Sequence, residues 1–72
     1  MPDLQKIEGS STIAEVGYEK DSRQLTVRFH HGGTYSFADV PEDEHNALLT
    51  APSIGKHFHA RIRGCYPATK LT

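Results

Sequence analysis

The chain has 72 residues, which is enough for one domain with a single hydrophobic core and too few for a second. Hydrophobic residues make up 36% of the chain, and no apolar run approaches the roughly 18 residues of a membrane-spanning helix. Cys65 is the only cysteine, which excludes an internal disulfide and a cysteine-based zinc site. With no secretory-signal pattern at the N-terminus, these features predict a globular protein of the cytoplasm that does not enter a membrane.

The charges are segregated along the chain, although the formal net charge is only -1. All nine acidic residues precede Ala51, whereas four of the eight lysines and arginines follow it. Residues 52–72 therefore contain bases and no acids. Such a segment favours contact with an anionic partner.

In chain order, residues 1–10 come first and lack hydrophobic periodicity, so we expect a flexible N-terminal arm before a single domain over residues 11–72. Apolar and polar residues then alternate over residues 12–18, 25–29 and 35–37. This period of two predicts three half-buried strands. The short loops between them leave no room for crossovers, so the strands are expected to form an antiparallel meander.

The first loop has turn chemistry over four residues, which sets the register of the first hairpin. It pairs Tyr18 with Leu25 and places Glu15 opposite Arg28 on the outer face of the sheet. We expect the latter two residues to form a surface ion pair.

For the second hairpin we expect a three-residue loop over residues 31–33, with a glycine at positive φ. This loop pairs Phe29 with Tyr35 and Val27 with Phe37. Tyr35 and Phe37 then point inward beneath the helices. Core packing is therefore favoured over base stacking for these two rings.

The first helix is predicted to begin after Asp39, which can cap it, with Pro41 in the first turn and Pro52 ending it at Ala51. Acidic residues 42–44 complement the positive end of the helix dipole. The residues expected to face the core are Leu48 and Leu49, with His45 nearby.

The second helix is predicted to begin at Ser53 and to end at Gly64. Ile54, Phe58 and Ile62 recur every four residues and should form its buried stripe. The predicted fold is thus α+β, a three-stranded antiparallel β-meander followed by two helices packed on one face, in the order β-β-β-α-α.

A distributed set of residues resembles a known domain over roughly five-sixths of the chain. The matching residues are Ser11, Ile13, Val16-Gly17-Tyr18, Leu25-Thr26-Val27-Arg28-Phe29, Gly32-Gly33-Thr34-Tyr35-Ser36-Phe37, Val40-Pro41, Ala47-Leu48-Leu49, Ala51-Pro52-Ser53, Gly55, Ile62-Arg63-Gly64 and Tyr66-Pro67.

This pattern resembles the KTSC domain, a bacterial module that is named for the C-terminus of some lysyl-tRNA synthetases and also occurs alone. The family is described by a central Tyr-x-Tyr, and here Phe37 replaces the second tyrosine, which removes one hydroxyl. The resemblance implies no catalytic residues to carry over. It implies a function still unassigned, with RNA binding proposed from the synthetase context.

The basic second helix is the sharpest functional feature of the sequence. At 100° per residue, Lys56, His59 and Arg63 form one outward stripe, and His57 and Arg61 lie at the other edge of the apolar face. The simpler interpretation is that these bases complement the helix dipole and keep the surface soluble. The proposed contacts with RNA or another polyanion are Lys56, His59, Arg61, Arg63, Tyr66 and Lys70.

We expect no metal, no cofactor and no catalysis. His57 and His59 lie about 200° apart on a helix and cannot share one ion. Cys65 follows a helix end without a recognisable base, so we expect it to be inert. Binding is expected to be weak, because the basic stripe spans only two or three phosphates.

The alternative is a module for protein interaction or self-association through an edge strand. The candidate edges are residues 12–18 and 34–37.

Overall fold

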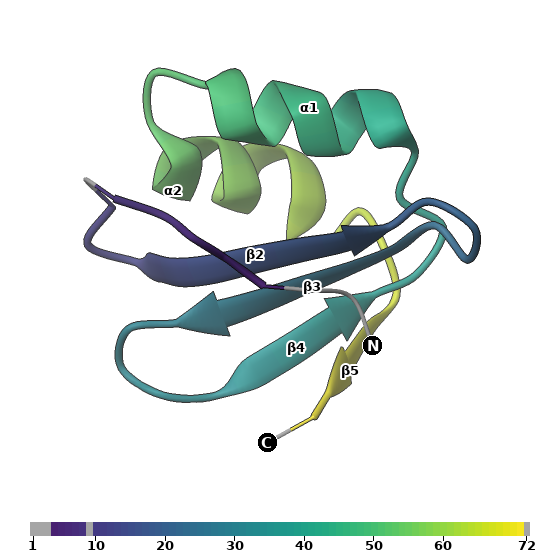
Figure 1. The fold of residues 1–72 in the computed structure, drawn as a ribbon, viewed down its shortest axis with the longest axis horizontal. Coiled ribbons are helices and arrows are strands. Elements are labelled where there is room, and N and C mark those ends of the chain that lie inside the picture. The colour runs from purple at the N-terminus through teal and green to yellow at the C-terminus, as the bar shows by residue number, and fades with distance from the viewer. Residues whose placement is uncertain (1–3, 9, 72) are drawn as a thin grey trace.

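A computed structural model describes residues 4–8 and 10–71, in which a five-stranded antiparallel sheet is covered on one face by two helices (Figure 1). The strands lie in chain order across the sheet: β1 (Gln5–Lys6), β2 (Ile13–Glu19), β3 (Gln24–Phe29), β4 (Thr34–Phe37) and β5 (Ala68–Lys70). Between β4 and β5 come α1 (Glu42–Thr50) and α2 (Ile54–His57), and α2 continues into a π-helical turn, η1 (Phe58–Ile62).

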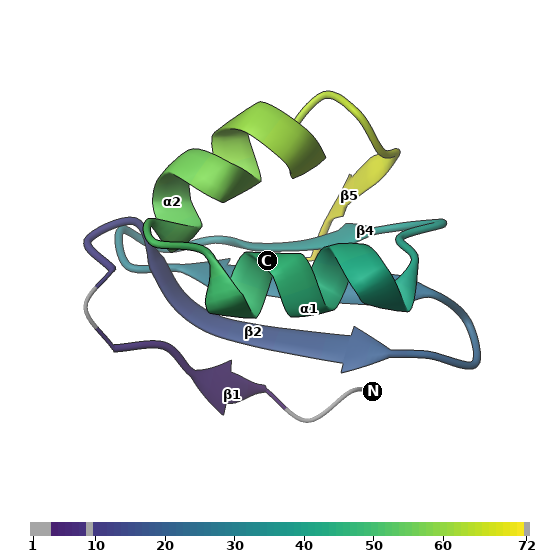
Figure 2. The same cartoon turned by 90° about the horizontal axis from the view of Figure 1, so that it is seen from above.

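The sheet has two more strands than the three predicted from the sequence. β1 pairs with β2 through Gln5 opposite Val16, and β5 pairs with β4 through Ala68 opposite Phe37. Figure 2 shows β1 lying outside β2. These strands have two and three residues, which is too short for alternation to reveal them. The predicted edges, residues 12–18 and 34–37, are therefore interior strands.

The expected loose arm over residues 1–10 is wrong for its middle part. Gln5 and Lys6 form β1, and Ile7 is only 7% exposed and belongs to the hydrophobic core. The backbone N–H of Ile7 donates to the carbonyl of Ala14 at 2.9 Å, which holds this segment against β2. Residues 1–3 and 9 of the expected arm lie outside the described residues.

The first hairpin has the predicted register, with Tyr18 opposite Leu25 and Glu15 opposite Arg28. Arg28 Nη1 donates to Glu15 Oε1 at 2.7 Å on the outer face, as expected. An irregularity between Ile13 and Glu15 resembles a β-bulge and lets Ile13 point into the core.

The second hairpin differs from the expected register by two residues. Val27 pairs with Tyr35 and Leu25 with Phe37, so the three-residue loop covers residues 30–32 rather than 31–33. A shift of two keeps every side chain on its predicted face. Gly32 and Gly33 both have positive φ, +97° and +90°, which permits the turn to begin one residue earlier.

α1 begins without the predicted Asp39 cap. Pro41 occupies the N-cap position and no side chain bonds the first turn, while Asp39 itself has a positive φ of +62°. The N–H of Val40 donates to the carbonyl of Arg23 at 2.9 Å, which ties the helix entry to the β2–β3 turn. The predicted end is confirmed, because the backbone before Pro52 is extended.

The second helix follows the prediction at both ends. The Ser53 side chain accepts the N–H of Lys56, and Gly64 follows the helix with a φ of +83°. Phe58 and Ile62 are buried and Ile54 is half-buried, so the predicted apolar stripe faces the sheet. The π-helical turn was not predicted.

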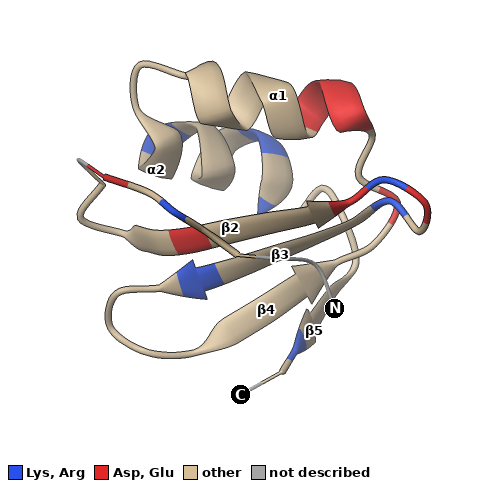
Figure 3. Ribbon diagram, viewed as in Figure 1, with Lys and Arg blue, Asp and Glu red and all other residues tan. Residues whose placement is uncertain are grey.

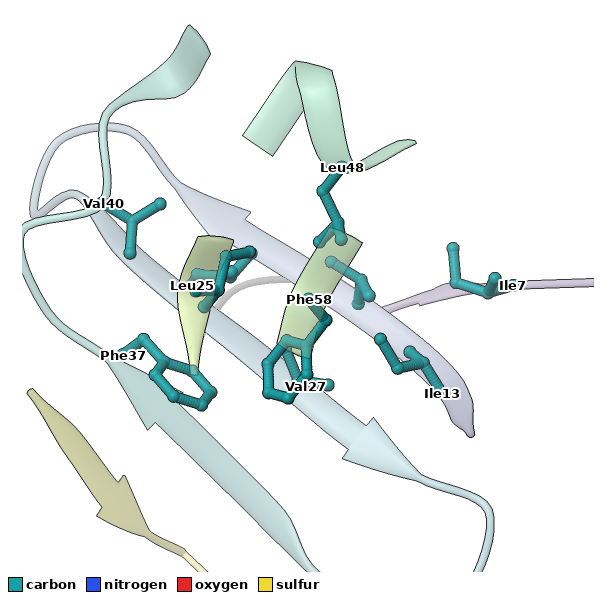
Figure 4. Close-up of a cluster of buried hydrophobic side chains, with 10 residues drawn as sticks. Ile7, Ile13, Leu25, Val27, Phe37, Val40, Leu48 and Phe58 are labelled. Carbon is teal, nitrogen blue, oxygen red and sulfur yellow. The ribbon is translucent and has the colours of Figure 1, made fainter. Parts of the chain in front are cut away.

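The core lies between the sheet and the two helices (Figure 4). Among the residues that the structure describes, ten are buried and hydrophobic: Ile7, Ile13, Val16, Leu25, Val27, Phe37, Val40, Leu48, Phe58 and Ile62. They come from β2, β3, β4, α1, η1 and the segments beside β1 and before α1. Within the described ranges, no helix has the length and apolar character needed to cross a membrane.

Candidate nucleic-acid interface

A groove of about 650 Å³ lies where η1, the β3–β4 hairpin and β5 meet. Its aromatic lining includes Phe29, Tyr35 and Phe58. Phe29 is the centre of this group, because its ring packs edge-on against Tyr35 at 5.6 Å and against Phe58 at 5.4 Å between ring centroids. Phe58 is only 2% exposed, whereas Phe29 and Tyr35 are half-buried. The latter two rings therefore supply the accessible aromatic surface.

The groove also has a basic rim. His59 and Arg63 contribute from η1 and the residue after it, His31 from the hairpin and Lys70 from β5. Arg63 Nη1 lies 3.5 Å from His59 Nδ1, and Lys70 is opposite Tyr35 in the sheet register. None of the described residues that line the groove is acidic.

Acidic and basic segments occupy different parts of the helical layer (Figure 3). The first turn of α1 carries three acids, residues 42–44, while α2 and the turn after it carry bases. The two groups touch at Glu44, whose Oε1 lies 3.1 Å from His57 Nε2 and 3.9 Å from Arg61 Nε. Glu44 therefore offsets the charge on one side of the second helix.

The groove can accommodate a ligand that combines an aromatic ring with negative charge. Half-buried aromatic rings offer stacking surface, and a rim of cations favours phosphate. Within the described part of the chain, no three histidine, cysteine or acidic side chains are placed to share a metal ion. Cys65 is free and exposed.

A family model described as the KTSC domain matches residues 9–66. The chain belongs to the KTSC domain family. A crystal structure of a KTSC domain protein from Yersinia pestis is similar over 100% of both chains, with a TM-score of 0.95 and 33% sequence identity. The resemblance noted from the sequence is thus confirmed.

The relatives of this KTSC domain include parts of larger proteins. A lysine–tRNA ligase of Nostoc punctiforme is 36% identical over 69 residues, which are 96% of this chain and 12% of the ligase. An uncharacterized protein of Stutzerimonas stutzeri is 38% identical over 50 residues, covering 69% of this chain and 70% of that protein. The chain therefore spans only a small part of the ligases it matches.

The KTSC fold brings together three of the six residues predicted to contact nucleic acid. His59, Arg63 and Lys70 all line the groove, although Lys70 comes from a strand that was not predicted. These three residues therefore share one surface, whereas the sequence analysis grouped them only by their charge.

The other three predicted contacts lie elsewhere. Lys56 is exposed beside a second groove that includes Glu8. Arg61 points toward Glu44, and Tyr66 packs half-buried against the core. None of these three residues lines the aromatic groove.

The sequence analysis did not propose Phe29 or His31 as contacts and assigned Tyr35 to the core, although all three line the groove. The alternation correctly placed Phe29 and Tyr35 on the inner face, and the error was to treat that whole face as covered by helices. Both rings stay half-buried in the structure, and no local pattern in the sequence indicates this incomplete cover.

A separate pair of titratable rings lies away from this groove. The Tyr18 and His45 rings stack with centroids 4.7 Å apart, and Tyr18 Oη donates to the carbonyl of Val40 at 2.6 Å. Burial raises the pKa of Tyr18 above its usual value and lowers the pKa of His45 below its own. Glu42 opposes the effect of burial on the His45 pKa.

Proposed function

We propose that this KTSC domain is a non-catalytic RNA-binding module of the cytoplasm, and that it contacts RNA through the groove rimmed by His59, Arg63 and Lys70. The observation that carries the proposal is the composition of the groove, which combines accessible aromatic rings and basic side chains and, among the described residues, has no acidic lining. RNA presents the complementary chemistry, with a phosphate in every nucleotide and bases that stack on aromatic side chains.

The relatives support the choice of RNA over other polyanions. Those named lysine–tRNA ligase act on a tRNA, and nearly the whole of this chain aligns with a part of them. A weak RNA-binding domain works well when it is joined to a protein that already holds the RNA, because tethering raises its effective concentration to the millimolar range. The isolated domain would bind far less tightly.

The small size of the basic rim limits the affinity. His59 and Arg63 are one helical turn apart, and Lys70 faces them from β5, so the rim can neutralise only two or three phosphates. We therefore expect a dissociation constant on the order of 10⁻⁴ M at physiological salt. Binding should weaken as salt rises, because each phosphate contact releases counterions.

The test is a titration with a 12-nucleotide single-stranded RNA at two salt concentrations, followed by amide chemical shifts. Arg63→Glu should weaken binding about tenfold at low salt. Lys20→Glu makes the same change in net charge on the β2–β3 turn, at the other end of β3 from the hairpin, and should have less than about a twofold effect.

Two results would contradict the proposal. One is equal weakening by the two charge reversals, which would show that only net charge matters. The other is binding that does not change with salt. Shift changes around Gly33 and Lys70 would instead place the RNA at the groove.

A further inference from the structure

The groove has chemistry beyond a general attraction for phosphate. A surface that binds only the backbone of a nucleic acid needs cations and hydrogen-bond donors. Here the cations stand around Phe29 and Tyr35, which are half-buried and adjoin one another edge-on at 73° between ring planes. Aromatic surface at this place offers a stacking partner that phosphate alone would not use.

Packing in the hydrophobic core accounts for only some of the aromatic residues that line the groove. Phe58 fills the core, and Phe37 packs against it edge-on at 5.4 Å with only 3% of its own surface exposed. Phe29 and Tyr35 lie farther toward the hairpin, where they flank the core without being enclosed by it. Their exposed surface is therefore available to a ligand.

The walls of the groove leave room beside these rings. Gly32 and Gly33 form the hairpin wall without side chains, and a Cβ placed on Gly32 would meet no atom within 4 Å. Gly64 on the opposite wall is equally open. The groove volume of about 650 Å³ is within the range of small-ligand sites.

We infer that the groove of Phe29, Tyr35, Arg63 and Lys70 is a subsite for one unpaired base of single-stranded RNA, with the base against the two rings and an adjoining phosphate at the two cations. This inference rests on the proposed function and adds which part of the RNA the groove recognises. A base within a duplex is stacked on its neighbours and cannot reach the rings. The subsite should therefore prefer single-stranded RNA and tolerate any base, because every base has a stacking face.

The decisive comparison uses the unaltered protein and two RNA hexamers of equal length and charge. One hexamer has 2-aminopurine at its centre, and the other has abasic sugars at all six positions, so that it carries the same phosphates and no base. We expect the first to bind about tenfold more tightly and its fluorescence to be quenched on binding. Since neither arm requires a mutation, the result does not depend on a variant folding.

Variants then assign the preference to residues. Tyr35→Ser should bring the two hexamers to nearly equal affinity, whereas Tyr35→Phe should retain the preference because the ring remains. Arg63→Gln should weaken both hexamers by a similar factor, since both carry the phosphates. Circular dichroism of each variant shows whether the fold is kept.

The outcomes separate this inference from the proposed function. Equal, salt-dependent binding of both hexamers would overturn the base subsite and leave RNA binding intact, while binding of neither would overturn both. Adenosine monophosphate binding as tightly as the hexamer would show a mononucleotide site. Tighter binding of a phosphotyrosine peptide would show a peptide site, and either result would overturn the inference.

Discussion

Tyr18 links the end of β2 to the entry of α1. Its hydroxyl donates to the carbonyl of Val40, which is fully buried, and its ring stacks on His45 at an interplanar angle of 11°. Removing the hydroxyl would leave that carbonyl without this donor, which is costly where water is excluded. The Tyr18 side chain thus ties the sheet to the first helix in two ways, through the hydrogen bond of its hydroxyl and through the stacking of its ring.

Tyr18→Phe should lower the free energy of unfolding by about 1 to 2 kcal/mol at pH 7, as measured by urea denaturation. Because the pKa of Tyr18 is raised in the folded protein, its contribution is present below pH 10 and is lost as the pH rises above 10. The variant should therefore lose less stability than the natural chain between pH 9 and about 11. Tyr66→Phe serves as the control, and an equal effect there would contradict the assignment.

His45 gives the opposite dependence on pH. Its lowered pKa means that the unfolded chain takes up a proton first as the pH falls below the usual value of 6.5. The stability that the neutral ring contributes is present above pH 6.5 and is lost on acidification. His45→Gln should therefore reduce the stability difference between pH 7.5 and about 5.5, as measured by urea denaturation. A difference that is unchanged would contradict this role of His45.

At the scale of elements, the π-helical turn keeps the apolar residues of the second helix on one side of the helix. Residues spaced by four drift around an α-helix, because four exceeds its 3.6 residues per turn. The N–H of Arg63 instead donates to the carbonyl of Phe58 at 2.8 Å, five residues earlier. This wider turn reverses the drift and keeps Ile62 in line with Ile54, so the apolar stripe stays against the sheet.

The end of that turn depends on the backbone of Gly64, which has a φ of +83° and open space where a Cβ would lie. Gly64→Ala should therefore cost about 1 kcal/mol through backbone conformation alone, without a steric clash. Gly64→Asn should cost less, because asparagine tolerates this region better than alanine. Urea denaturation of both variants tests this order, and a larger loss for asparagine would contradict the conformational explanation.

At the scale of the whole molecule, long-period patterns predicted most of the fold. Alternation in β2, β3 and β4 and the four-residue repeat from Ile54 to Ile62 identified the sheet and its covering helix. β1 and β5 escaped because strands of two and three residues carry no detectable period. They are stabilised by pairing with neighbours that exist only once the chain has folded.

The groove was harder to predict than the fold for a related reason. His59 and Arg63 were proposed on charge and helical spacing, and the structure places them at the groove. Tyr35 joins them because β5 closes the far side of the sheet beside β4. Three segments distant in sequence thus form one surface, and no local pattern reports how they meet.

β5 covers the edge of β4, and this leads to a prediction for the whole chain. All three of its residues are exposed and none belongs to the buried core, so removal of residues 68–72 should leave the fold in place. The loss would expose β4, whose sequence Thr-Tyr-Ser-Phe is suited to pairing with a second copy.

Light scattering should show a monomer for the full chain and a mass that rises with concentration for the shortened one. Adding Thr34→Lys to the shortened chain should restore the monomer, because a charge on an open edge disfavours pairing. A shortened chain that stays monomeric at high concentration would show that β5 is not what keeps this edge from pairing.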